Sequence, residues 1–130
     1  MSVEVNGRKP TIVLVDDEVA IRNAMTRFFE RRGWRCIQAA DGAEAERVLF
    51  GDPAPCDFDV VLCDLRLPVR SGLELFARAA AERPDVAERF VLSSGDTGGL
   101  AVDCPVLAKP FPLAEVARMA DAILDRVKAA

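Results

Sequence analysis

Three short apolar runs in this chain each end in a charged residue, and this pattern constrains the fold more than any other feature of the sequence. The runs and their endings are Thr11–Val15 before Asp16-Asp17, Asp59–Cys63 before Asp64, and Pro105–Ala108 before Lys109. If the runs are parallel strands, all three endings lie at one edge of one sheet, which is where open α/β sheets bind ligands. We therefore expect a carboxylate cluster with a single ammonium group, a combination that can hold a divalent metal and leave one carboxylate free to react.

Strand-like and helix-like patterns alternate along the rest of the chain. We predict strands at residues 11–15, 34–39, 60–63, 90–94 and 106–108, and helices at 18–32, from the Asp41 cap to Gly51, from Gly72 to before Pro84, and from Pro112 onward. This alternation implies a parallel sheet with helices on both faces. In the helix that begins near Gly72, the apolar spacing assigns Leu73, Phe76 and Ala80 to the inner face.

The connection Gly95–Cys104 breaks the alternation. It has only ten residues, whereas a strand-to-strand crossover that contains a helix needs at least about 10–12 residues. Three of its residues are glycines, which disfavour a regular helix. We expect the fourth helix, between the last two strands, to be short or absent.

The composition is that of one acidic domain. The chain has 130 residues, a net charge of −4 and no basic block, which argues against direct nucleic-acid binding. It has no apolar stretch long enough to span a bilayer, and residues 1–9 lack a signal-peptide core. We expect a single cytoplasmic domain over 1–130, with its core at about 11–127, no output domain and no membrane contact.

Four cysteines and no histidine exclude several kinds of site. Cys36, Cys56, Cys63 and Cys104 include no C-x-x-C pair, and no histidine is present to complete a zinc site or a Ser-His or Cys-His catalytic pair. We interpret all four as reduced thiols and expect Cys63 to be buried in a strand.

Acidic residues in the first strand-to-helix turn suit a metal better than a phosphate. Asp16-Asp17-Glu18 would repel an anion, whereas Mg²⁺ prefers carboxylate and phosphate oxygens. Taken alone, these acids could equally cap the helix that follows. Asp64 favours the metal interpretation, because a carboxylate at the end of a buried strand is costly unless a cation or metal pairs with it. Lys109 is the compensating ammonium in this hypothesis.

Several separated motifs resemble the receiver domain of two-component response regulators. The motifs are Asp16-Asp17, Asp64-Leu65-Arg66-Leu67-Pro68-Val69-Arg70-Ser71-Gly72, Ser94-Gly95 and Lys109-Pro110-Phe111. The resemblance covers about 11–127, and the D-x-x-x-P-x-x-x-G pattern and the K-P-F ending are its most specific parts. It implies a flavodoxin-like (CheY-like) doubly wound sheet of five parallel strands in the order 2-1-3-4-5.

The resemblance also implies a function. Asp64 would accept a phosphoryl group from a sensor histidine kinase, a hybrid kinase or a histidine phosphotransfer protein. The other implied roles are Mg²⁺ binding by Asp17, Asp64 and the Arg66 backbone carbonyl, Mg²⁺ binding through water by Asp16, and contact with phosphoryl oxygens by Lys109 and Ser94. The resemblance further implies a cis peptide bond at Lys109–Pro110. The domain would signal to a downstream protein or relay phosphate, and it would not be a turnover enzyme.

Two residues depart from the usual receiver pattern. Val106 stands three residues before Lys109, where many receivers carry an aromatic ring that follows the switch hydroxyl. Arg66, two residues after Asp64, is bulky and cationic; it could screen the acyl phosphate or pair with it, or it could simply be solvated. We expect Arg66, Val106 and Pro110 to modulate the site, and the stretch Gly95–Cys104 to become ordered on phosphorylation.

Two alternative functions remain open at this point. A pseudo-receiver would have the same fold and bind partners without phosphoryl chemistry, although the complete acid set and Lys109 argue against it. An aspartyl-phosphate hydrolase of the haloacid dehalogenase type is disfavoured because the acids of the first turn, Asp16 and Asp17, are adjacent rather than arranged as D-x-D.

Overall fold

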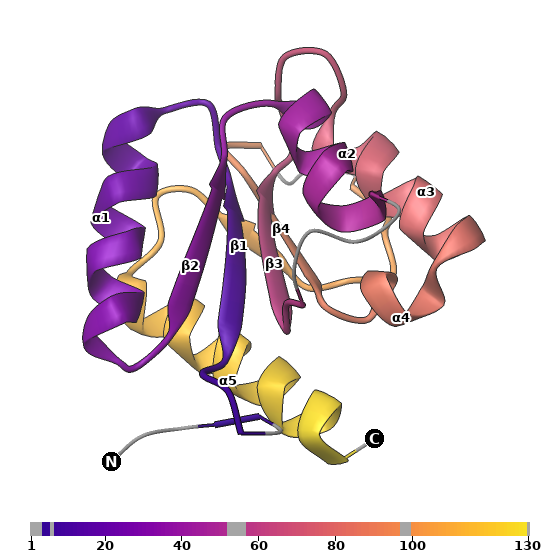
Figure 1. Cartoon of the computed structure of the whole chain (residues 1–130). Coiled ribbons are helices and arrows are strands. Elements are labelled where there is room, and N and C mark those ends of the chain that lie inside the picture. Colours follow the sequence, from indigo (N-terminus) through magenta and orange to yellow (C-terminus); the bar gives the residue numbers. More distant parts are fainter. Residues whose placement is uncertain (1–3, 6, 52–56, 97–99, 130) are drawn as a thin grey trace.

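The computed structural model describes residues 4–5, 7–51, 57–96 and 100–129. Within these residues, five strands form one parallel sheet in the order β2-β1-β3-β4-β5, as predicted (Figure 1). The strands are β1 (Thr11–Val15), β2 (Arg35–Ala39), β3 (Val60–Asp64), β4 (Phe90–Ser94) and β5 (Val106–Ala108). The predicted strands are therefore confirmed to within one residue, and β3 continues one residue further, to include Asp64.

Helices cover both faces of the sheet (Figure 1). They are α1 (Val19–Arg31), α2 (Gly42–Phe50), α3 (Gly72–Glu82), α4 (Pro84–Ala87) and α5 (Leu113–Ala129). The core residues of α1 and α5 pack in one hydrophobic cluster, and those of α2, α3 and α4 pack in another. Neighbouring residues of a strand belong to opposite clusters, because side chains alternate between the two faces of a sheet. Leu14 belongs to the first cluster and Val15 to the second.

The inner face of α3 differs from the predicted one. Leu73 is 40% exposed and Ala80 is also exposed, whereas Leu75 and Ala79 are buried together with the correctly predicted Phe76. The rotation of α3 about its axis is determined where the helix begins. A Cβ added at Gly72 would lie 2.3 Å from the Asp64 carbonyl oxygen, so Gly72 packs against the end of β3 and sets the rotation of α3.

A short helix, α4, was not predicted. Pro84 ends α3 as expected, but it also occupies the first turn of α4, where proline is well tolerated. Val86 of α4 is buried in the second cluster. In the connection from β4 to β5, the described residues 95–96 and 100–105 contain no helix, as expected; residues 97–99, which include two of the three glycines, lie outside the described residues. No helix in the described part of the chain has the length and apolar character needed to span a bilayer.

An ion pair closes the edge of the sheet where the strands begin. The Arg8 guanidinium donates to both carboxylate oxygens of Asp59, at 2.9 and 3.0 Å, and the Thr11 backbone N–H donates to the same carboxylate at 2.8 Å. The Asp59 side chain is fully buried. Val5 is also buried and belongs to the first hydrophobic cluster. No sequence pattern predicts that Arg8 pairs with Asp59.

Candidate functional site

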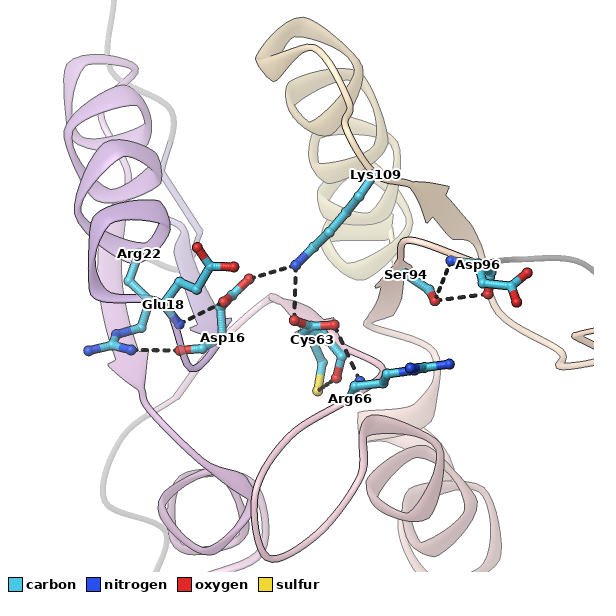
Figure 2. Close-up of polar contacts among 9 residues, drawn as sticks. Asp16, Glu18, Arg22, Cys63, Arg66, Ser94, Asp96 and Lys109 are labelled. Carbon is cyan, nitrogen blue, oxygen red and sulfur yellow. Dashed lines mark hydrogen bonds and ion pairs between the residues drawn. The ribbon is translucent and has the colours of Figure 1, made fainter.

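The opposite edge of the sheet brings together the charged residues that follow the strands. The Lys109 ammonium lies 2.9 Å from Asp64 Oδ2 and 3.1 Å from Asp16 Oδ2. Figure 2 shows the Lys109 side chain pointing toward Asp16. Parallel strands make this convergence possible, because β1, β3 and β5 all end at this edge. The expected cluster of carboxylates with one lysine is therefore present.

Asp17 completes a group of three carboxylates. One oxygen from each of Asp16, Asp17 and Asp64 lies within 4.8 Å of the other two, close enough for all three to contact one ion. Asp16 and Asp64 are buried, whereas Asp17 is exposed. The cluster is thus held by the fold on one side and open to solvent on the other.

Lys109 balances only part of the negative charge. Burial by itself lowers the pKa of its ammonium, but hydrogen bonds to Asp64 and Asp16, together with their charges, outweigh burial and hold the net pKa above its ordinary value. The ammonium pairs with two of the three clustered carboxylates, and Asp17 lies beside them. Three carboxylates with one ammonium suit a divalent cation with oxygen ligands.

Local hydrogen bonds fix the orientation of Asp16. Its Oδ1 accepts from the Glu18 backbone N–H at 2.9 Å, which leaves Oδ2 for Lys109. The Arg22 guanidinium donates to the Asp16 carbonyl at 2.6 Å (Figure 2). Arg22 is not among the predicted site residues, although it stands one turn into the predicted helix 18–32 and hence near the acidic turn.

Asp64 is oriented in a similar way. Its Oδ1 accepts from the Arg66 backbone N–H at 3.3 Å, and its Oδ2 contacts Lys109. The Arg66 backbone therefore lies beside the carboxylate, while the residue as a whole is exposed. The Leu65 N–H donates to the Ser93 carbonyl at 2.8 Å and ties the chain just after Asp64 to β4.

Ser94 lies at the same edge but is engaged elsewhere. Its hydroxyl donates to the Asp96 carbonyl at 2.9 Å and accepts from the Asp96 N–H at 3.1 Å, and Figure 2 shows it turned toward Asp96. The Lys109 backbone N–H donates to the Ser94 carbonyl at 2.8 Å, so both residues stay at the site. Val106 is half-buried and packs on the second hydrophobic cluster. The Lys109–Pro110 peptide bond is cis, as predicted.

The described cysteines are free thiols with raised pKa values. Cys63 is buried in β3 as expected, and burial, followed by the charges of Asp64 and Asp16, raises the pKa of its thiol. Burial is also the largest cause at Cys36 and Cys104, where it raises the pKa to about 11. Such thiols are mostly protonated near neutral pH and are poor nucleophiles. Cys56 lies outside the described residues.

Known proteins that resemble this chain are signalling proteins. Residues 12–120 match the model of the response regulator receiver domain. The aerobic respiration control protein ArcA of Escherichia coli (strain K12) is 32% identical over 122 residues, a match that covers 90% of this chain and 49% of ArcA. The chain therefore spans about half the length of this curated relative.

Solved structures share the fold. The receiver domain of the hybrid histidine kinase CckA is 26% identical, with a TM-score of 0.70 over 88% of this chain and 98% of that chain. The response regulator TrrA of Thermotoga maritima, solved in complex with Mg²⁺–BeF, is 24% identical, with a TM-score of 0.74 over 88% of this chain and 99% of that chain. Because the family model spans most of the chain and the strand order is that of a receiver, the chain belongs to the family of response regulator receiver domains.

Proposed function

We propose that this domain is a phospho-accepting receiver and that Asp64 takes a phosphoryl group from a phosphohistidine. The observation that carries the proposal is the Asp64 carboxylate, which lies 2.9 Å from the Lys109 ammonium and within 4.8 Å of two further carboxylates. A structural ion pair would need one carboxylate for one ammonium. Two extra acids at the same edge are better explained by a cation that they share.

The reaction needs charge neutralisation more than acid–base catalysis. An Asp64 carboxylate oxygen attacks phosphorus, the P–N bond to the histidine breaks, and the electron pair leaves with the imidazole nitrogen. Lys109 stabilises the negative charge that develops on the phosphoryl oxygens. The product is a mixed anhydride of a carboxylic and a phosphoric acid, which water hydrolyses readily, so the modification suits a transient signal.

Mg²⁺ fits the carboxylate cluster. Asp17 and Asp64, with the Arg66 backbone carbonyl, would hold the ion, and Asp16 would contact it through water. When bound, Mg²⁺ neutralises phosphoryl oxygens beside the acceptor. The structurally similar TrrA was solved in complex with Mg²⁺–BeF, which supports a Mg²⁺ site in this domain.

The relatives support a proposal about the protein partners. CckA, whose receiver domain has the same fold, is a hybrid histidine kinase, and ArcA is a control protein of aerobic respiration. We propose a histidine kinase, a hybrid kinase or a phosphotransfer protein as the phosphodonor and a protein as the downstream target. On this proposal the domain is a signalling module rather than a turnover enzyme.

Intact-mass spectrometry with acetyl phosphate tests the proposal. The wild type should gain one phosphoryl group with Mg²⁺ and none in EDTA, and Asp64→Asn should gain none. Asp59→Asn, at the opposite edge of the sheet, should still be labelled and serves as the matched control. Undiminished label on Asp64→Asn would rule out the acceptor. A wild type that binds Mg²⁺ and takes no label from acetyl phosphate or a kinase panel would favour the pseudo-receiver.

A further inference from the structure

The loop between Asp64 and α3 contains a turn in an unfavourable conformation. Val69 has φ of 73°, and the Arg70 N–H donates to the Pro68 carbonyl at 2.9 Å. These two features describe a γ-turn with a positive φ at its centre, which is the rare and strained form. A β-branched residue is a poor choice for a positive φ. The Val69 side chain does not offset the strain by burial, because it is 73% exposed.

Contacts from α2 hold this turn in place. The Gly42 N–H donates to the Pro68 carbonyl at 3.1 Å, and a Cβ at Gly42 would lie 2.4 Å from Arg70 atoms, so only glycine allows α2 to approach this closely. Glu46, one turn further along α2, accepts from Arg70 Nε at 3.0 Å. The same carboxylate accepts from Arg78 of α3 at 2.8 Å. Glu46 therefore ties both the turn and α3 to α2.

The strained turn and the acceptor belong to the same short loop. At one end, the Arg66 N–H donates to the Asp64 carboxylate at 3.3 Å. At the other end, the Gly72 N–H donates to the Leu65 carbonyl at 2.8 Å and closes the loop on itself. Because this hydrogen bond keeps the loop ends together, a change in backbone conformation at the Val69 turn should also shift the backbone at Arg66.

We propose that Glu46 is a positioning residue for the metal site: it holds the strained Val69 turn against α2 and thereby keeps the Arg66 backbone beside the Asp64 carboxylate. This inference rests on the proposed Mg²⁺ site. Glu46 is not one of the proposed Mg²⁺ ligands, and it forms ion pairs with Arg70 and Arg78. Its effect comes from the shape that it imposes on the loop, and the strain at Val69 is what would relax if Glu46 were lost.

Isothermal titration of the full chain with Mg²⁺ alone provides the first arm of the test. Glu46→Ala should raise the Kd for Mg²⁺ about threefold to tenfold, less than the ~10–100-fold typical of groups that contact a metal ligand directly. Glu46→Gln loses the same charge but keeps an oxygen acceptor, so it should restore most of the affinity. Glu82→Ala is the matched control, because Glu82 pairs with Arg78 at 3.5 Å on the far side from the loop.

A double-mutant cycle with Val69→Asn isolates the strain. Asparagine tolerates a positive φ, so Val69→Asn should raise the Tm in metal-free buffer by about 3 °C. In that background Glu46→Ala should change the Kd for Mg²⁺ by a smaller factor than in the wild type. Three results would overturn this inference without affecting the proposed function. They are an equal change in the Kd for Mg²⁺ from Glu46→Ala in both backgrounds, an unchanged Tm for Val69→Asn, and equal effects of Glu46→Ala and Glu82→Ala on the Kd. A wild type that binds no Mg²⁺ would overturn the proposed function as well.

Discussion

Both edges of the sheet pair buried carboxylates with a cationic side chain, but the ratio of carboxylates to cations differs. At the edge where the strands begin, the buried carboxylate of Asp59 has both oxygens on the Arg8 guanidinium and a third hydrogen bond from the Thr11 backbone. At the edge where the strands end, the one ammonium of Lys109 is shared between Asp64 and Asp16, and Asp17 lies beside them. The first site pairs one carboxylate with one guanidinium, and the second groups three carboxylates with one ammonium.

This difference in the ratio of carboxylates to cations distinguishes a structural ion pair from a site that can bind a metal ion. The Asp59 charge is matched by one guanidinium and its carboxylate accepts three hydrogen bonds, so an added cation finds no unbalanced charge there, and breaking the pair leaves a buried charge without a partner. A surplus of carboxylates costs stability in the absence of metal, which is the usual compromise at a functional site. We therefore expect Asp59 to stabilise the fold at one edge and Asp64 to destabilise the metal-free fold at the other.

The largest expected effect is that the same substitution, aspartate to asparagine, changes the free energy of unfolding in opposite directions at the two edges. Asp59→Asn should lower the free energy of unfolding by about 2 kcal/mol, because it breaks the charge-assisted pair with Arg8, whose side chain is one-third exposed. Asp64→Asn should raise the free energy of unfolding by about 1 kcal/mol in metal-free buffer, because it removes one of three crowded carboxylates. Urea unfolding of both variants in EDTA measures the contrast, and equal destabilisation would remove the distinction between the edges.

A smaller effect is the stabilisation by Mg²⁺. At a tenfold excess over its Kd, Mg²⁺ should add about 1.4 kcal/mol to the unfolding free energy of the wild type. Asp17→Asn should lose most of this gain at the same concentration, whereas Asp59→Asn should keep it in full. Thermal unfolding with and without Mg²⁺ measures both. The comparison fails if Asp59→Asn abolishes the gain, or if Asp17→Asn leaves it intact.

The smallest effect is a dependence on alkaline pH at one edge only. Because the pKa of Lys109 is raised in the fold, its contribution to stability is fully present below its unfolded pKa of about 10.5 and is lost as the pH rises through the higher folded value. The stability difference between wild type and Lys109→Met should therefore be constant from pH 6 to 9 and shrink above about 10.5. The Arg8 guanidinium stays charged throughout, so the difference for Arg8→Met should not change. Titration of the cysteine thiols affects wild type and variants alike and cancels in both differences.

Much of the fold could be predicted because it depends on local patterns. Apolar runs, the Asp41 cap and the glycine and proline breaks defined the strands and most helix ends. The acids and lysine of the site could be predicted for a similar reason: each follows a strand, and parallel strands end at one edge. The rotation of α3 could not, because it depends on the close approach of Gly72 to the Asp64 carbonyl rather than on the apolar spacing.

The features that the sequence did not predict depend on the three-dimensional contacts of individual side chains. Arg8 and Asp59 are 51 positions apart, and an aspartate before a strand is equally typical of a turn. Glu46 and Arg70 are 24 positions apart on elements rich in charged residues, so no pattern singles them out as partners. The orientation of Ser94 depends on its hydrogen bonds to the Asp96 backbone, which the sequence does not reveal. The expected ordering of Gly95–Cys104 on phosphorylation stays a prediction, because the described residues omit the middle of that segment.

A magnesium titration followed through backbone amide resonances tests the contrast between the edges most directly. We expect saturable shifts that fit one Kd at Asp16, Asp17, Asp64 and Arg66, and unchanged resonances at Arg8, Thr11 and Asp59. Sodium at matched ionic strength controls for nonspecific charge effects. Saturable Mg²⁺ shifts confined to the first set would support one metal site at the edge where the strands end. Shifts of equal size at both edges, or no saturable shift at Asp17 and Asp64, would contradict it.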